Sequence, residues 1–248
     1  MFEPLLDAPG AVAETGPERI LVVADYHAGV EVGLRRDGVE IDSRADSRRE
    51  RLLSLVERTG PDRVLLLGDV GDAIDTPRGA ERTELRRLFE ALLKRASVTV
   101  TRGNHDGNIE AVTDGFDIEV SEGPGVRIGS VGFCHGHTWP GEAVLDADVV
   151  CTAHEHPLVR LTDEVGGGRS ERVWLRGRLD PAGFADSAAT PPAETEAELV
   201  VCPAFNDLVG GTHVNESTSF LSPFLPDGLK DGQAYLLDGT RLGDYRAV

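Results

Sequence analysis

The sequence predicts an α/β fold built on a largely parallel sheet. Three apolar runs, residues 19–25, 63–67 and 97–101, are typical of strands covered on both faces. Two stretches with apolar residues at helical spacing, 43–59 and 83–95, separate these runs. Strand, helix, strand, helix, strand is the order of right-handed βαβ units, and such units build parallel sheets.

The elements before and between these strands follow from local sequence. Residues 1–18, which contain Pro, Gly and Glu, predict an irregular lead-in with one short edge strand. Residues 30–42 include an Asp37-Gly38 turn and predict a loop or short helix beside the first strand's end. Gly60-Pro61 ends the first long helix, and the second places leucine and phenylalanine on one face.

Beyond Asp114 the pattern changes to short strands joined by glycine turns. Gly166-Gly167-Gly168 is expected at a hairpin tip, and residues 180–196, rich in Ala, Pro and acidic residues, as a solvated and mobile insertion. No repeat or linker is evident, so residues 1–248 are expected to form a single domain. The expected strands are 116–120, 126–128, 131–137, 148–153, 158–162, 171–176, 198–202 and 235–237.

The composition is unusually acidic. The net charge is −18, and of the 25 basic residues only Lys94 and Lys230 are lysine. This balance is typical of halophilic proteins, as in haloarchaea, because charges at about 1 M salt are screened within about 3 Å. An ordinary acidic protein is the alternative. Since repulsion is screened in high salt, the charge decides neither for nor against a nucleic-acid partner.

Several classes of protein are disfavoured. No apolar run is long enough to cross a membrane and the acidic N-terminus does not resemble a signal peptide, so we expect a soluble, cytoplasmic chain with no membrane partner. Cys134, Cys151 and Cys202 lie in apolar strand-like runs and are expected to be buried, reduced thiols. A homo-oligomer remains open.

Side chains that bind metals follow five of the strand-like runs. Of the seven histidines, only His213 lies outside these strand ends. Sites in open α/β sheets form beyond the carboxyl ends of strands, so we expect these groups to share one crevice. The candidates are Asp25, His27, Asp69, Asn104, His105, His135, His154 and His156.

This donor set predicts the metal and the chemistry. Carboxylate, amide and imidazole donors without cysteine favour manganese, with iron, zinc, cobalt or nickel as alternatives. The set exceeds the needs of one ion, and two ions about 3.5–4 Å apart are suited to phosphoester hydrolysis. The sequence contains no Walker loop, no dinucleotide-binding glycine fingerprint and no Gly-x-Ser-x-Gly elbow.

Five ordered motifs between Ile20 and Pro157 resemble the calcineurin-like metallophosphoesterase superfamily. Residues 23–31 and 203–211 are similar, more narrowly, to archaeal SbcD-related phosphoesterases and bacterial ligase-associated DNA-damage-response phosphoesterases. The resemblance implies a four-layer α-β-β-α sandwich of two mixed sheets. The motifs are Asp25-Tyr26-His27, Gly68-Asp69-Val70-Gly71-Asp72, Gly103-Asn104-His105-Asp106, His135-Gly136 and His154-Glu155-His156.

The resemblance also implies a role for each residue. Asp25, His27 and His156 would hold one ion, Asp69 would bridge, and Asn104, His135 and His154 would hold the other. His105 would protonate the leaving oxygen or stabilise the developing charge, Asp106 would orient His105, and Asp72 would support the site from outside the ligand set. Ala153 stands where the family has glycine, which is a mild change in backbone freedom.

Weaker candidates for substrate contact have structural alternatives. Arg35, with the nearby Arg36, Arg48 and Arg49, could contact phosphates, but a solvated helix face is the favoured interpretation. His137 either reaches the substrate or only lies beside His135. His213 follows a glycine pair and could line the crevice.

The predicted function is a dinuclear metal-dependent phosphoesterase, most consistent with a phosphodiesterase or nuclease, in which a metal-bridging hydroxide attacks phosphorus in line. A phosphomonoesterase on nucleotides or small phosphates is one alternative. A non-catalytic scaffold is another, although no motif residue is missing. The expected partner is a phosphoester substrate, with nucleic acid as one class, and a helicase or ligase is a candidate functional neighbour.

Overall fold

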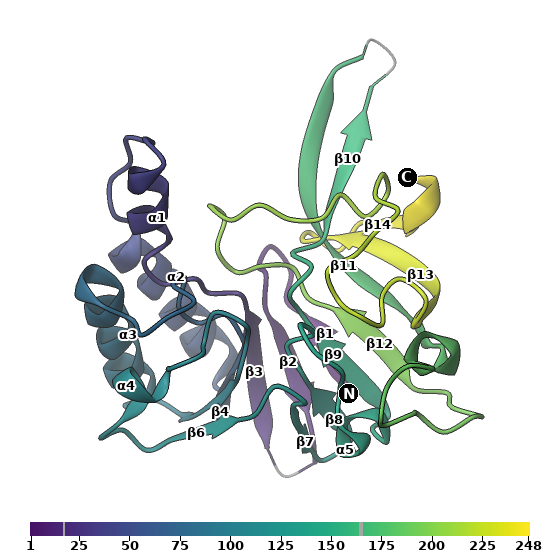
Figure 1. Cartoon of the computed structure of the whole chain (residues 1–248), viewed down its shortest axis with the longest axis horizontal. Helices are drawn as coiled ribbons and strands as arrows, with labels where there is room; N and C mark the ends of the chain where they lie inside the picture. Colours follow the sequence, from purple (N-terminus) through teal and green to yellow (C-terminus); the bar gives the residue numbers. More distant parts are fainter. Residues whose placement is uncertain (17, 164–165) are drawn as a thin grey trace.

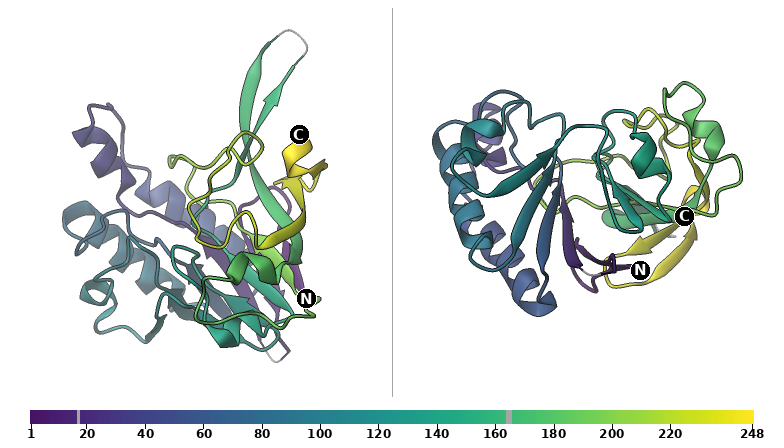
Figure 2. Two further views of the ribbon diagram at one scale, coloured as in Figure 1. Left: turned by 45° about the vertical axis from the view of Figure 1, so that its right-hand side comes forward. Right: turned by 90° about the horizontal axis from the view of Figure 1, so that it is seen from below.

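Two β-sheets pack face to face, and helices cover the outer side of the first (Figures 1 and 2). The computed structural model describes residues 1–16, 18–163 and 166–248. The first sheet has the order β1-β2-β3-β4-β5-β6, in which β3 to β6 are parallel and β1 and β2 form an antiparallel edge. Its strands are β1 Phe2–Pro4, β2 Ala11–Glu14, β3 Arg19–Ala24, β4 Arg63–Leu67, β5 Ser97–Thr101 and β6 Ile118–Ser121.

Three helices, α2, α3 and α4, lie on the outer face of this sheet, whereas α1 projects beyond the strand ends (Figure 1). Their apolar stripes are buried against it, as with Leu52 and Leu55 of α2 and Leu85 and Leu88 of α3. Burial of such a stripe is the main stabilisation of an amphipathic helix. The helices are α1 Val30–Arg36, α2 Ala45–Thr59, α3 Gly79–Leu92 and α4 Glu110–Thr113.

The second sheet has the order β14-β13-β11-β12-β9-β8-β7, and β10 pairs with β11 beyond this path. It is mixed, because β12, β9 and β8 run parallel while the other pairs are antiparallel. Its elements are β7 Val126–Ile128, β8 Val131–Phe133, α5 Glu142–Leu145, β9 Val149–Thr152, β10 Leu158–Thr162, β11 Gly168–Leu179, η1 Pro181–Phe184, β12 Glu198–Val201, β13 Leu229–Leu236, β14 Arg241–Asp244 and η2 Tyr245–Ala247.

Three apolar clusters separate the layers. One lies between the first sheet and its helices, one between the two sheets around Trp174, and one on the outer face of the second sheet. The predicted fold class is therefore confirmed. The outermost layer on the second sheet is thin, since α5 and η1 are single short turns.

Some predicted elements differ in the structure. Residues 1–18 contain two strands rather than one, because β2 pairs with β1 on one side and with β3 on the other. β11 extends well beyond the predicted 171–176, since one end pairs with β10 and the other with β12 and β13. The stretch 180–196 is tied to the outer cluster by Phe184, which is fully buried and stacks on Phe224 at 5.2 Å.

Other predictions are met. The three cysteines are buried and free. Gly166 and Gly167 lie at the turn of the β10–β11 hairpin, beside residues 164–165, which fall outside the described residues. Among the described residues, no helix is long and apolar enough to cross a membrane.

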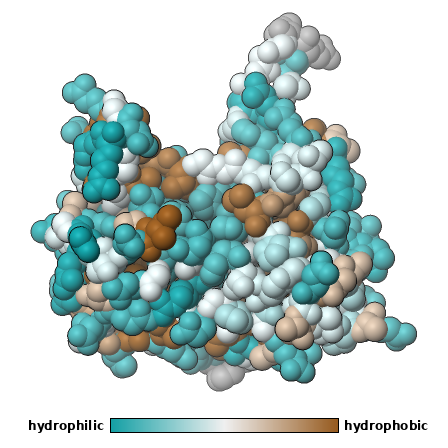
Figure 3. Space-filling model, viewed as in Figure 1, coloured by the Kyte–Doolittle hydropathy of each residue, from teal (hydrophilic) through white to brown (hydrophobic). Residues whose placement is uncertain are grey.

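Two projections flank a hollow in the molecular surface. One contains α1 and the other is the β10–β11 hairpin, and the surface dips between them (Figures 1 and 3). His27 comes three residues before α1, and His156 comes two residues before β10. The predicted ligands therefore lie where both projections begin.

Candidate metal centre

The predicted ligands come from both sheets. Asp25 directly follows β3 and Asp69 lies two residues beyond β4. Asn104 and His105 follow β5 in the same sheet. His135 follows β8 of the second sheet, and His154 and His156 follow β9. The face-to-face packing of the sheets joins these strand ends in one cluster.

The carboxylate of Asp69 is common to two groups of donors. One group contains Asp25, His27, Asp69 and His156, and the other contains Asp69, His135 and His154. Asp69 Oδ2 lies 3.8 Å from His27 Nε2 and 3.3 Å from His135 Nε2. Asn104 Oδ1 adds to the second group, 3.3 Å from His135 Nε2. All seven predicted ligands are thus brought together.

Hydrogen bonds made on the side away from the cluster fix the orientation of three imidazoles among the predicted ligands. The Nδ1 atom of His135 donates to the Leu67 carbonyl at 3.1 Å, and that of His156 donates to the Gly210 carbonyl at 2.7 Å. The Nδ1 atom of His27 lies 3.2 Å from Asp72 Oδ1. Each ring therefore presents Nε2 toward the cluster, which is the usual arrangement for a metal-bound histidine.

The backbone at the cluster is strained. Asp25, His27, Asp69, His154 and His156 all have left-handed φ, between 44° and 70°. Among the described residues, only Asp7 and Asp231 share this conformation without being glycine. Left-handed non-glycine residues are costly and gather at functional sites. The tertiary packing thus holds five of the seven predicted ligands in conformations that a free chain would avoid.

The donors fit divalent cations. Both carboxylate oxygens of Asp25 are buried and lack a hydrogen-bond partner among the described residues. The Nε2 atoms of His27 and His156 lie only 3.4 Å apart, so two lone pairs would face each other without a cation or proton between them. A buried charge without compensation is costly. Oxygen and imidazole donors in this arrangement suit a transition-metal ion.

The electrostatics of the cluster support the same conclusion. Burial favours neutral His135, but the carboxylates of Asp69 and Asp25 outweigh burial and raise its pKa to about 9. Burial likewise opposes the charge of Asp69, yet His135 and His27 hold the pKa of that carboxyl well below its ordinary value. Burial and the charge of His135 lower the pKa of His154 to about 4. The negative charge of these carboxylates can be compensated either by a proton on His135 or by a bound divalent ion.

The ring of His105 lies beside this cluster and is held by a different residue from the predicted one. Its Nδ1 hydrogen-bonds to the backbone carbonyl of Asp72, and its Nε2 lies 4.0 Å from Asp69 Oδ2. The expectation that Asp106 orients this ring is wrong. The Asp106 carboxylate instead accepts bonds from the backbone N–H groups of Val70, Gly71 and Gly103, because it is buried between the two loops.

Asp72 therefore links a predicted ligand to the predicted acid. Its carboxylate meets His27 and its carbonyl meets His105. The buried carboxylate of Glu81 in α3 fixes this residue, since Oε1 accepts the N–H groups of Asp72 at 2.9 Å and Ala73 at 3.0 Å. No feature of the sequence indicated this role, because Glu81 occupies an ordinary helix position.

Asn206 is a second supporting residue that the sequence did not identify individually. It is fully buried, and its Nδ2 donates to the carbonyls of Tyr26 at 3.0 Å and His27 at 3.1 Å. Phe205 stacks on Tyr26 with ring centroids 5.8 Å apart. The stretches 23–31 and 203–211, which carried the narrower resemblance, therefore lie side by side.

The three residues predicted to contact the substrate differ in where they lie relative to the cluster. The ring of His137 lies 5.4 Å from that of His135, so it borders the cluster. His213 is directed instead to Ser170 of β11, at 2.8 Å. Arg35 bonds to the Ile41 carbonyl, whereas its neighbour Arg36 lines the same pocket as His105.

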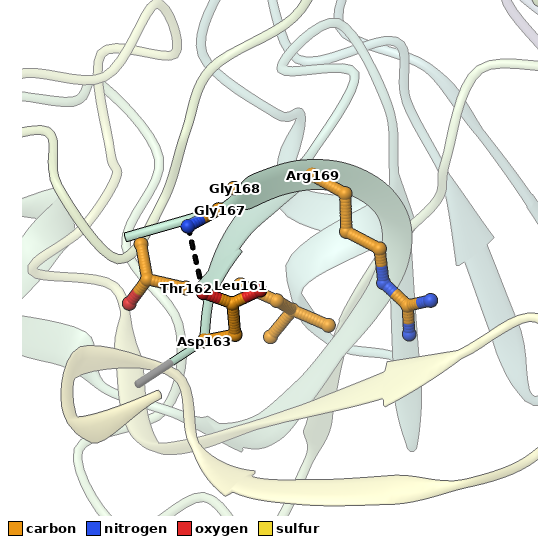
Figure 4. A pocket seen from close by; sticks show the side chains of 6 residues that line it. All are labelled: Leu161, Thr162, Asp163, Gly167, Gly168 and Arg169. Carbon is orange, nitrogen blue, oxygen red and sulfur yellow. Dashed lines mark hydrogen bonds between the residues drawn. The ribbon is translucent and has the colours of Figure 1, made fainter. Parts of the chain in front are cut away.

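A separate hollow lies in the β10–β11 hairpin. Its volume is about 500 Å³, and two of the residues that line it are joined by a hydrogen bond from Gly167 N to Asp163 Oδ1 (Figure 4). None of its six lining residues belongs to the metal centre.

Known proteins resemble this chain in sequence and in fold. The sequence matches the calcineurin-like phosphoesterase family over residues 18–142. The structure is similar to that of the Pseudomonas putida nuclease MPE, at 17% identity and a TM-score of 0.57, covering 96% of this chain and 98% of that chain. It is also similar to Yfce, a phosphoesterase from E. coli, at 22% identity and a TM-score of 0.35, covering 58% and 73% of the two chains. No curated protein matches the sequence.

Proposed function

The chain belongs to the calcineurin-like phosphoesterase family, and from this premise we propose that it is a dinuclear metal-dependent phosphodiesterase of the nuclease type. The fold likeness to a Pseudomonas putida nuclease, over nearly the whole of both chains, supports the nuclease assignment. The narrower resemblance, manganese as the metal and adaptation to high salt are parts of the same proposal.

The shared position of Asp69 is the observation that carries the proposal. Its carboxylate belongs to both donor groups, so one residue can serve two ions. The buried carboxylate of Asp25, which accepts no hydrogen bond from the described residues, supplies a second anionic donor. Two ions held there would supply Lewis-acid charge and an activated water nucleophile.

The protein's own residues would complete the reaction. In hydrolysis, a bond forms between phosphorus and the water oxygen, and the bond to the leaving oxygen breaks. His105 lies at the edge of the cluster, and among the described residues its Nε2 makes no hydrogen bond, so it can give a proton to that leaving oxygen. The Asp72 carbonyl keeps Nδ1 engaged and thereby fixes the orientation of the ring.

Hydrolysis of bis-p-nitrophenyl phosphate with added manganese, in high salt, tests this proposal. Asp69→Asn should abolish tight binding of two ions, measured by metal analysis after dialysis. His105→Ala should keep the ions but lower kcat by about 10²–10⁴-fold. Arg82→Gln, an exposed change on α3, is the control and should behave as wild type.

The outcomes separate the alternatives. Unchanged rates in both variants would contradict the assignment. Preference for an aryl monoester, without cleavage of single- or double-stranded DNA, would indicate a phosphomonoesterase. Absence of bound ions, with no rescue by manganese, would indicate a non-catalytic scaffold.

A further inference from the structure

A pocket of about 500 Å³ opens beside His105 and contains none of the seven predicted ligands. Its walls come from α1, from the loop between β4 and α3, and from the first residues of α3. The volume is in the range of small-molecule sites. Since His105 faces the leaving oxygen in the proposed reaction, the group that departs would occupy this pocket.

Two arginines of the pocket have no partner. Arg36 and Arg78 line it, and among the described residues neither guanidinium makes an ion pair, a hydrogen bond or a ring contact. The chain has 43 acidic and 25 basic residues, so free carboxylates are plentiful. Most other arginines are paired, including Arg35 with the Ile41 carbonyl. Unpaired guanidiniums beside a catalytic group favour an anionic ligand.

The carboxylates of the pocket are mostly engaged. Asp72 binds His27, and Glu81 accepts two backbone N–H groups. Asp75 is the exposed anionic group that remains, so it only partly offsets the two guanidiniums. The mouth also presents Ile74, a large apolar side chain that is 69% exposed.

The pocket is tied to the loop that carries His105. Asn108 Nδ2 donates to Thr76 Oγ1 at 2.6 Å, and Gly107 lies so close to the Ile74 carbonyl that a Cβ would approach it to 3.1 Å. With the bond from His105 to the Asp72 carbonyl, these contacts fix the pocket relative to the imidazole.

We propose that this pocket binds the leaving-group nucleotide of a single-stranded polynucleotide, with Arg36 and Arg78 contacting its next phosphate and Ile74 contacting its base. The inference rests on the proposed function and specifies its substrate. A small phosphomonoester has neither a second phosphate nor a base in its leaving group, so it would leave these three side chains unused.

The test compares two substrates in one double variant. Arg36→Gln/Arg78→Gln removes both charges. Arg82→Gln/Arg87→Gln is the matched control, since these two exposed arginines also have no side-chain partner in the described part of the chain but lie outside the pocket. With a short oligothymidylate, the pocket variant should lose about tenfold in kcat/KM. With bis-p-nitrophenyl phosphate, both variants should remain within about twofold of wild type.

Salt dependence gives a second measurement that a purely structural effect would not change. Each lost phosphate contact should make the slope of log kcat/KM against log salt less negative by about 0.7 for a single strand. Ile74→Ser should lower kcat/KM on the oligonucleotide without changing this slope.

Equal losses on both substrates, or no loss on the oligonucleotide, would overturn the pocket assignment. Hydrolysis of the aryl diester alone by the wild-type enzyme would also overturn it, while leaving the phosphodiesterase proposal intact. Hydrolysis of neither substrate would overturn the proposed function as well.

Discussion

Replacement of Glu81 by alanine tests whether α3 positions the catalytic groups. Glu81 is 6% exposed, and its Oε1 accepts the N–H groups of Asp72 and Ala73. Asp72 in turn holds His27 by its carboxylate and His105 by its carbonyl. Glu81→Ala would therefore release a predicted ligand, His27, and the proposed acid, His105, together, although Glu81 contacts neither side chain.

The structure sets the expected size of this effect. The Ala73 N–H loses its acceptor, whereas the Asp72 N–H keeps the Ala28 carbonyl at 3.1 Å, so the free energy of unfolding should fall by about 1–2 kcal/mol. Loss of a residue that orients ligands typically weakens metal affinity or activity by about 10–100-fold. Glu81→Gln retains an oxygen that can accept both bonds and should restore most of the activity.

Urea unfolding, metal titration and the pH profile of kcat measure these effects separately. Leu145→Ala, in the cluster outside the second sheet, provides a comparable loss of stability without contact to Asp72. If Glu81→Ala is destabilised but keeps wild-type metal affinity, kcat and pH profile, then Glu81 has no positioning role. If Glu81→Gln is as impaired as Glu81→Ala, the argument from the accepting oxygen fails.

Three further predictions concern the centre itself. A Cβ on Gly103 would lie 2.2 Å from Asp69 Oδ1, so Gly103→Ala should weaken metal binding at least tenfold in a metal titration. Gly210→Ala is the control, because a Cβ there would meet open space, and its metal affinity should not change. Asn206→Ala should lower the free energy of unfolding by about 2–3 kcal/mol in urea, because it removes two donated bonds and one accepted bond. In chelator-treated protein, the raised pKa of His135 stabilises the fold fully below about pH 6.5 and this contribution disappears as the pH rises to about 9. Melting curves across that window should show the fall, and His135→Asn should lack it.

Much of the fold and the clustering of the candidate metal donors could be predicted from local sequence. Apolar runs between helices predicted the parallel strands, and polar residues at their ends predicted the cluster. This worked because the carboxyl ends of parallel strands share one edge, so a residue's place on its strand already determines the side of the sheet. The two-sheet architecture was predicted from the family resemblance, because the local sequence of the short strands beyond Asp114 does not indicate which strands pair with each other.

The sequence by itself determined which side chains could bind metal, because donor chemistry belongs to each residue and strand-end position is local. The tertiary structure alone decided how they are used. It placed Asp69 in both donor groups, assigned His105 to the Asp72 carbonyl rather than to Asp106, and directed His213 away from the centre. These outcomes depend on which backbone carbonyl and N–H groups the packing brings within about 3 Å of each side chain. They also depend on the left-handed backbone conformations of these residues, which only the assembled loops can stabilise.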